Sequence, residues 1–224
     1  NKKCRDGKWE NCKEIPSYVL QYVSNVIEYN RRLGMVNAQV TTSSFGLYSS
    51  ALPTTNYLSK SEYDQIVAAA PSRNPGSSVK YIVLHHSGGS NIEEVLQANI
   101  QTRNNEHYID GKNGEVVNVI PEELSAQHAN CLNDMSIGIE VVNKGDGIDE
   151  YPEQQLNGLK GLVTDLIERY KIQQNFLIGH GCTSLNKLAD EPKGLDPNFL
   201  GNGLNVVKRE GSIPTCNMLC PAVV

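Results

Sequence analysis

Apolar positions along the chain fall into short runs that end in polar residues and longer segments with helical spacing. The clearest short run is residues 81–86 (YIVLHH), in which four apolar or β-favouring residues lead into two adjacent histidines and a Ser-Gly-Gly turn. That composition is typical of a strand buried on both faces. Residues 136–142 (SIGIEVV) and 176–180 (FLIGH) are similar, the first with one carboxylate, Glu140, and the second ending in His180. The three runs predict the inner strands of a sheet.

Between these strands the spacing of the apolar residues changes to that of helices. Residues 92–100 have apolar side chains at helical positions, preceded by Ser90 and Glu93 as a capping box. A longer helix over residues 152–170 has an apolar stripe made of Leu156, Leu159, Leu162, Val163, Leu166, Ile167 and Tyr170. Residues 107–109 and 115–120 predict two strands joined by a DGKNG turn. Strands that alternate with helices indicate an α/β fold.

Residues 1–75 do not follow this alternation and predict a small helical N-terminal extension. Apolar spacing indicates one helix over residues 16–33 and a short one over residues 61–70, capped by its first serine. Residues 71–78 (PSRNPGSS) have the composition of a linker. We therefore expect an N-terminal extension over residues 1–75 and a catalytic domain over residues 76–224.

Composition excludes several classes of protein. Of the 224 residues, 39% are hydrophobic and 20% are charged, which fits an ordinary globular protein. The net charge of −5, with no strongly basic block, argues against binding to nucleic acid or to an anionic membrane surface. No apolar run approaches the length of a membrane span, and the first residues lack a signal-peptide pattern. We expect an intracellular or a mature, trimmed chain that acts as a monomer.

Six cysteines bear on the choice between those two forms. An even number, with close pairs near both termini, favours disulfides in an exported protein. The pairing that we favour among the possible ones is Cys4 with Cys12, Cys131 with Cys182, and Cys216 with Cys220. Reduced cysteines in a cytosolic protein are the alternative. A four-cysteine zinc site is disfavoured because the chain has no CxxC pair.

Two strands that end in histidine indicate a metal site. Side chains alternate along a strand, so only one of His85 and His86 can point into a given site. Either histidine alone is well explained as a hydrogen-bonded core residue. His180 at a second strand end favours the metal interpretation, because zinc is commonly bound by imidazole nitrogens together with a carboxylate or thiolate. A catalytic zinc needs three protein ligands and an open position for water, and the sequence supplies such a set.

Glu140 is the candidate for proton transfer at this site. It shares a strand face with Ser136 and Gly138, two small residues that leave room beside its carboxylate. There it can take a proton from a metal-activated water and pass it to a leaving nitrogen. The alternative is a buried glutamate paired with a lysine or arginine, and the residues alone leave both interpretations open.

An ordered set of motifs resembles one known family. The set consists of YIVLHHSGG, EHYID with NGEV, QHAN, NDMSIGIEVVN, YPEQQLNGL, FLIGH and KGLDPNF. It is similar to the zinc-dependent N-acetylmuramoyl-L-alanine amidases of the type-2 amidase and peptidoglycan-recognition superfamily, over roughly residues 81–200. The resemblance implies a central mixed β-sheet flanked by helices, with a Zn²⁺ ion in a groove that binds peptidoglycan.

The resemblance also implies the metal ligands. Carried over to this chain, they are His85, His180 and Asp196, with Glu140 as general base. Asp190, ten residues after His180, fits the family's usual spacing better but lacks a following proline. We prefer Asp196 because Asp-Pro-x-Phe matches the family motif. Cysteine also serves as third ligand in the family, but Cys182 is separated from His180 by one residue only.

Four further positions are implied to line the site. Tyr108 and His128 would orient the substrate or water, and His86 would contact the substrate. A lysine just before the third ligand normally stabilises the oxyanion, and Lys193 is the candidate. It stands three residues before Asp196 instead of the usual two, and Lys187 precedes Asp190 in a similar Lys-x-x-Asp arrangement.

Together these features predict a secreted or cell-wall-associated enzyme. Its expected reaction is zinc-dependent hydrolysis of the amide bond between the lactyl group of N-acetylmuramic acid and L-alanine in peptidoglycan. Two other functions stay open. One is a non-catalytic recognition protein that binds peptidoglycan with the same fold, and the other is a zinc peptidase that cuts within the stem peptide.

Overall fold

The computed structural model describes residues 52–53, 57–183, 186–201 and 203–209. By its internal contacts the chain divides into two compact units, residues 1–42 and 43–224. The helix expected over residues 16–33 lies outside the described residues, as do the cysteines near both termini. The strand and the helix that precede residue 75 belong to the second unit, together with the sheet.

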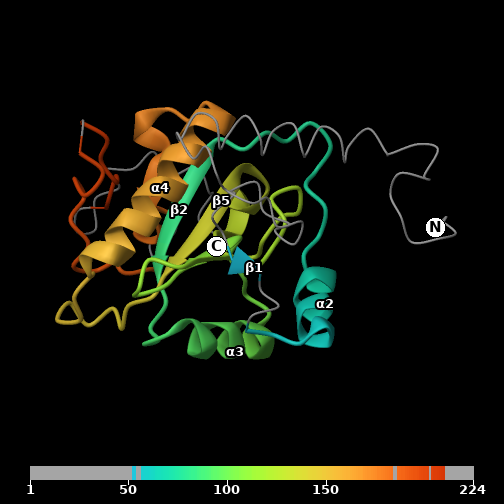
Figure 1. The fold of residues 1–224 in the computed structure, drawn as a ribbon. Coiled ribbons are helices and arrows are strands. Elements are labelled where there is room, and N and C mark those ends of the chain that lie inside the picture. The colour runs from blue at the N-terminus through green and yellow to red at the C-terminus, as the bar shows by residue number, and fades with distance from the viewer. Residues whose placement is uncertain (1–51, 54–56, 184–185, 202, 210–224) are drawn as a thin grey trace, which may run out of the picture. The chain divides into compact units, whose positions relative to one another are not determined.

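A mixed sheet of six strands forms the centre of the described part of the chain (Figure 1). In spatial order the strands are β1 (Leu52–Pro53), β4 (Val116–Asn118), β3 (Tyr108–Asp110), β5 (Ser136–Val141), β2 (Tyr81–His86) and β6 (Leu177–Gly179). The neighbours β3 and β4 are antiparallel, and each other neighbouring pair is parallel. The α/β class and the mixed sheet are confirmed.

The α-helices of the described residues are α2 (Lys60–Ala69), α3 (Ile92–Thr102) and α4 (Glu153–Tyr170). Short 3-10 helices are η3 (Asn130–Met135), η4 (Gln174–Phe176) and η5 (His180–Cys182). The predicted stripe of α4 is largely buried, through Leu159, Leu162, Val163 and Leu166. No helix in these described segments is both long and apolar enough to cross a membrane.

Two of the helix caps differ from the expected ones. Ser59, not Ser61, caps α2 in a full capping box, so the helix begins earlier than expected. Asn91, not Ser90, caps α3, and its side chain accepts the backbone N–H of Glu94 across 2.9 Å. Serine and asparagine are both preferred N-cap residues, so residue type alone does not distinguish between adjacent candidate positions.

The helices cover both faces of the sheet, as alternation along β3 makes clear. Ile109 packs in a core cluster with residues of α2 and α3. Tyr108, which points the other way, donates from its hydroxyl to Glu122, and Glu122 in turn pairs with Arg169 of α4. Thus α4 covers one face while α2 and α3 cover the other (Figure 1).

The parallel register of the central strands brings the predicted site residues together. His85 on β2 is directly opposite Glu140 on β5, so both side chains leave the sheet on the same face. Leu84 is opposite Gly179 of β6, and His180 follows at once. The carboxyl ends of β2, β5 and β6 therefore meet where an α/β sheet usually places its ligands.

Candidate metal centre

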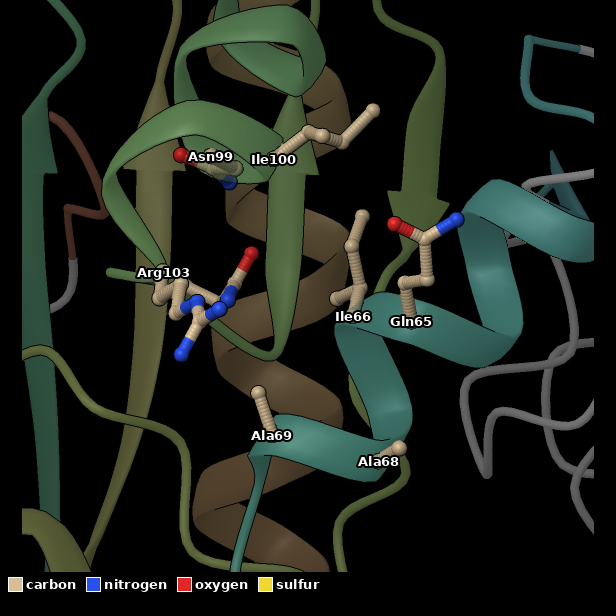
Figure 2. Close-up of a pocket in the computed structure, with 8 residues that line it drawn as sticks. Gln65, Ile66, Ala68, Ala69, Asn99, Ile100 and Arg103 are labelled. Carbon is tan, nitrogen blue, oxygen red and sulfur yellow. The ribbon is translucent and has the colours of Figure 1, made fainter.

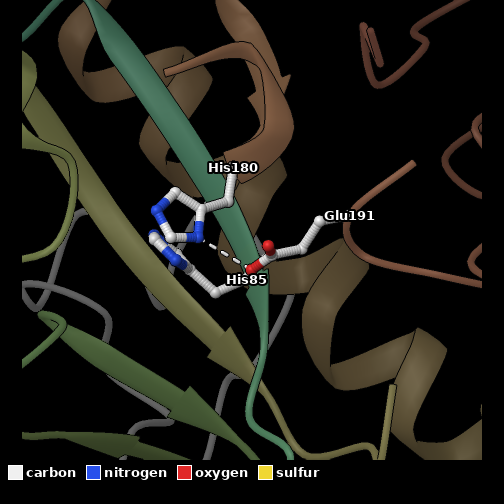
Figure 3. A group of neighbouring side chains, drawn as sticks. All are labelled: His85, His180 and Glu191. Atoms are coloured by element: carbon white, nitrogen blue, oxygen red, sulfur yellow. Dashed lines mark hydrogen bonds and ion pairs between the residues drawn. The ribbon is translucent and has the colours of Figure 1, made fainter. Parts of the chain in front are cut away.

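Three buried side chains from separate segments converge at these strand ends (Figure 3). His85 comes from β2, His180 from the start of η5, and Glu191 from the loop that follows. One ligand atom of each lies within 4.8 Å of the other two. His180 Nδ1 and Glu191 Oε1 are 2.7 Å apart, and the ring centroids of His85 and His180 are 4.0 Å apart.

A chain of hydrogen bonds orients the ring of His85. Ser136 Oγ donates to the carbonyl oxygen of Leu132 across 2.7 Å, so it accepts from His128 Nε2, 3.1 Å away. His128 Nδ1 then has no proton and accepts from His85 Nε2 across 3.0 Å. The resulting tautomer leaves the lone pair of His85 on Nδ1, where it is available to a metal ion.

Gly138 provides the space for this chain. A Cβ atom at position 138 would lie 2.5 Å from His128 Nδ1, well inside van der Waals contact. The small residues of β5 thus make room for His128, whereas the sequence suggested that they make room for Glu140. The backbone N–H of Gly138 also donates to His107 Nδ1 across 3.0 Å, which fixes a further buried histidine behind the site.

The surroundings keep these imidazoles neutral. Burial lowers the pKa of His85 well below its ordinary value, and the neighbouring His180 and His128 lower it further. The pKa of His128 is also lowered, first by burial and then by His107 and His180. A histidine must be neutral to bind a metal ion, so His85 is in the required form at neutral pH.

The residues present fit a divalent metal ion. His180 Nε2 is buried and has no hydrogen-bond partner among the described residues, so the protein does not fully satisfy this ring. Two imidazoles and one carboxylate are a donor set that zinc takes in catalytic sites, with a fourth position open. His85 and His180 come together as expected from the sequence, and Glu191 completes a group that can hold such an ion.

Two further carboxyl groups lie beside His85. The carboxyl groups of Glu140 and Glu106, the latter in the segment before β3, each have an oxygen within 4.8 Å of the other and of a ring nitrogen of His85. Burial raises the pKa of Glu140 well above its ordinary value, and Glu106 raises it further. Burial likewise raises the pKa of Glu106. Two buried carboxyl groups this close cannot both ionise at low cost.

These groups line a cavity of about 360 Å³, together with the exposed Lys187. The charge of Lys187 lowers the pKa of His85 and opposes the rise in the pKa of Glu140. A cation at the edge of such a cavity can stabilise negative charge that develops on a substrate oxygen. Lys187, the alternative to Lys193, is therefore the lysine that the structure brings to the cavity.

A second hollow, of about 370 Å³, lies between α2 and α3 (Figure 2). Ile66 and Ala69 line it from α2, and Asn99 and Arg103 from the end of α3. Asn99 Nδ2 also donates to Glu106 Oε2 across 3.5 Å, so this asparagine connects the rim of the hollow to the acidic pair. One buried amide, that of Asn99, thus lines the hollow and also contacts a residue of the first cavity.

Two predicted residues are not brought to the cavity. Asp196 is exposed, and its carboxylate accepts from the backbone and side-chain N–H groups of Asn198. Lys193 is half-buried, and its backbone N–H donates to His86 Nδ1 across 3.1 Å. In the described part of the chain neither residue lines the cavity. The carboxylate that the loop after His180 brings beside His85 and His180 is that of Glu191.

The remaining predicted residues have mixed placements. Tyr108 lies away from the cavity, because its hydroxyl is bonded to Glu122 on the face that α4 covers, and burial raises its pKa. His86 borders the cavity, but its ring accepts the N–H of Lys193 instead of joining His85. His128 lines the cavity and orients His85. Asp190 is exposed and lies outside the converging group.

Cys182, the other alternative ligand, is not available as a thiolate. Cys131 and Cys182 are the described cysteines, and each is disulfide-bonded. A thiol in a disulfide cannot bind a metal ion. The partner that each residue was expected to have, namely the other, stays a prediction.

Sequence reasoning missed two acidic residues of the site, Glu191 and Glu106. A signal for Glu191 was present, because it is followed by Pro192 and so forms an acid-proline pair at about the family's distance from His180. Glu106 directly precedes His107, inside the EHYID motif, and nothing in its spacing distinguishes it from a solvent-exposed residue at a strand start. Its burial arises from the chain path between α3 and β3.

Comparisons with known proteins identify a family and similar folds. The model of the family described as N-acetylmuramoyl-L-alanine amidase matches residues 75–197. A crystal structure of an AmpD derivative is 22% identical, covering 59% of this chain and 88% of that one, with a TM-score of 0.50. A point mutant of Drosophila PGRP-LB in complex with tracheal cytotoxin is 16% identical, covering 64% and 88%, also with a TM-score of 0.50. No curated protein sequence matches the chain.

Proposed function

Because the chain belongs to the N-acetylmuramoyl-L-alanine amidase family, we propose that it is a zinc-dependent amidase of peptidoglycan. The bond cut would be the amide between the lactyl group of N-acetylmuramic acid and L-alanine. The observation that carries the proposal is the convergence of His85, His180 and Glu191 beside a cavity that also contains Glu140. Such a group is what metal-assisted hydrolysis of an amide requires.

His85, His180 and Glu191 would hold the ion, and each is preorganised for that role. His128 fixes the tautomer of His85, and burial keeps that ring neutral. Glu191 already contacts His180. When bound, a zinc ion supplies a Lewis acid for the carbonyl and lowers the pKa of a water molecule toward neutrality.

Glu140 would act as general base and then as general acid. Its carboxyl lies within 4.8 Å of a ligand atom of His85, so it is next to a residue that would hold the ion. A raised pKa makes the carboxylate of Glu140 a stronger base toward a proton of water. The same carboxyl group can then deliver that proton to the alanine nitrogen. Lys187, at the edge of the cavity, would stabilise the negative charge on the carbonyl oxygen.

We also propose that the protein acts outside the cell or at the cell wall. Support comes from Cys131 and Cys182, which are both disulfide-bonded, because disulfides persist mainly in oxidising compartments. Peptidoglycan is found in such compartments. The proposed substrate and the proposed location are therefore consistent with each other.

Purified protein incubated with a defined muropeptide tests the proposed reaction. Mass spectrometry should detect two products. One is the N-acetylmuramic acid sugar with a free lactyl carboxylate, and the other is the peptide with a new L-alanine amino terminus. Chelation should abolish the products and added Zn²⁺ should restore them. A Glu140→Gln variant processed in parallel excludes a contaminating hydrolase.

Other outcomes of this experiment identify the alternative functions. Fragments cut between later residues of the peptide would identify a zinc peptidase. Muropeptide binding with no fragment, by protein that contains a full equivalent of zinc, would identify a recognition protein. Either result would overturn the proposed amidase activity.

A further inference from the structure

Glu106 and Glu140 form a second group of possible metal ligands with His85. One ligand atom of each of the three residues lies within 4.8 Å of the other two, and all three residues are buried. Only His85 is shared with the group that contains His180 and Glu191. The two groups are therefore adjacent but have different chemistry, since one is rich in imidazole and the other in carboxylate.

The carboxyl pair has no cation of its own. Neither Glu106 nor Glu140 makes an ion pair within 4.0 Å among the described residues. Glu106 Oε2 accepts from the neutral side-chain amide of Asn99 across 3.5 Å. Two buried carboxylates this close repel each other when both are ionised, and a divalent cation held between them would relieve that repulsion.

We propose that Glu106 and Glu140 form a second divalent-cation position next to His85. His85 has one lone pair, on Nδ1, and an ion held with His180 and Glu191 uses it. The second ion is then coordinated by the two carboxylates and by water, which suits cations such as Mn²⁺ and Mg²⁺.

Occupancy of this second position would inhibit the enzyme. A carboxylate that coordinates a cation cannot accept a proton from water, so Glu140 would no longer act as a base. This inhibitory consequence rests on the proposed amidase function. The binding of the second ion does not, because it depends only on the positions of the two carboxyl groups.

Titration of the zinc-loaded protein with Mn²⁺ tests the inference without an activity assay. The protein is first given one equivalent of Zn²⁺, and free Mn²⁺ is then followed by electron paramagnetic resonance. We expect one Mn²⁺ to bind to each wild-type chain. Glu106→Gln should weaken that binding roughly tenfold or more, whereas Glu123→Gln, an exposed residue outside the cavity, should leave it unchanged.

Two results would overturn the second position. One is a wild-type protein that binds no Mn²⁺ beyond its zinc, a result that needs no variant to fold. The other is a folded Glu106→Gln protein, judged by circular dichroism, with wild-type affinity for Mn²⁺. If the variant does not fold, anomalous scattering from Mn²⁺-soaked wild-type crystals decides, because the peak must lie between the carboxyl groups of residues 106 and 140.

Activity measured during the same titration separates this inference from the proposed function. Loss of turnover in step with Mn²⁺ binding supports both. Mn²⁺ binding without any turnover, even before Mn²⁺ is added, contradicts the amidase proposal and leaves the second position intact. Mn²⁺ binding that leaves turnover unchanged would show that Glu140 is not blocked, and would contradict the inhibitory role.

Discussion

His85 and His128 share a hydrogen bond of 3.0 Å whose direction is set by Ser136, one step further from the cavity. The serine accepts from His128 because its own proton is donated to the carbonyl oxygen of Leu132. The order of donors along this chain leaves a lone pair on His85 Nδ1. The backbone carbonyl of Leu132 on η3 thus determines which nitrogen of His85 has the lone pair that a metal ion could use.

Removal of the serine hydroxyl should therefore weaken metal binding. In Ser136→Ala the N–H of His128 Nε2 loses its acceptor, so the competing tautomer of His128 and His85 gains population. We expect zinc affinity to fall by about 10–100-fold, the usual range for such outer partners. Competition with a chelator of known affinity measures it. The control is Ser125→Ala, which removes another buried serine hydroxyl outside the cavity, and equal losses in both variants would refute the argument.

The third ligand can be tested by comparing two acidic residues. Glu191→Ala removes a buried carboxylate that contacts His180 Nδ1 across 2.7 Å, so zinc affinity should fall by roughly two orders of magnitude or more. Asp196→Ala removes an exposed carboxylate that only caps Asn198, and zinc content should remain at one equivalent. Metal analysis after dialysis gives both values. The opposite pattern would return the role to Asp196.

Most of the fold was predictable because its signals are local. The strands β2, β5 and β6 are short and buried on both faces, so their sequences are nearly continuous apolar runs. The helix α4 has an apolar stripe that matches its buried side. His85, His180 and Glu140 lie on or directly after such elements, and their positions followed from the strand ends.

The third ligand was not predictable in the same way. The loop from His180 to Asp196 has no periodicity, and it contains several acidic residues near a proline. The path of the loop over β6 decides which carboxylate reaches His180, and that path depends on packing. Tyr108 illustrates a different limit, because the face toward which it points depends on the register of β3 against β5, in which Ile109 and not Tyr108 is opposite Glu140.

Replacement of Glu140 by glutamine should separate metal binding from catalysis. Glutamine keeps the volume of the side chain but cannot accept a proton at neutral pH. We expect zinc content to be retained and turnover of muropeptide to fall by roughly two or more orders of magnitude. Metal analysis and product formation are measured on the same preparation. Turnover close to that of the wild type would remove Glu140 from the mechanism.

The stability of the protein should decrease in acid, in part through His107. Burial and Arg73 lower the pKa of His107 to about 3 in the folded state, while the unfolded chain has an ordinary value near 6.5. Between these two values the unfolded state binds a proton that the folded state does not. The free energy of unfolding therefore falls as the pH decreases from about 6.5 toward 3, by about 1.4 kcal/mol per pH unit for this one group.

A glutamine at position 107 isolates this contribution. Its amide can accept from Gly138 N–H, as His107 Nδ1 does, and it does not titrate. Urea denaturation of both proteins at several pH values between 4 and 7 should give a shallower dependence for His107→Gln. The contribution of His85 cancels in the difference, which therefore reports His107 together with its effect on the pKa of His128. Parallel curves would mean that His107 is not held neutral.

Gly138 provides a steric test of the same histidine network. In Gly138→Ala the new methyl group would meet the His128 ring at 2.5 Å, and the ring cannot retreat without breaking its hydrogen bonds to Ser136 and His85. We expect a loss of stability of about 1–3 kcal/mol, typical of overpacking, together with weaker zinc binding. Gly76→Ala is a control for backbone effects, because a Cβ there meets nothing within 4 Å although its φ of +88° disfavours alanine. It should lose stability but keep its zinc affinity, since Gly76 does not line the cavity. Zinc affinity that is unchanged in Gly138→Ala would mean that His128 does not orient the ligand.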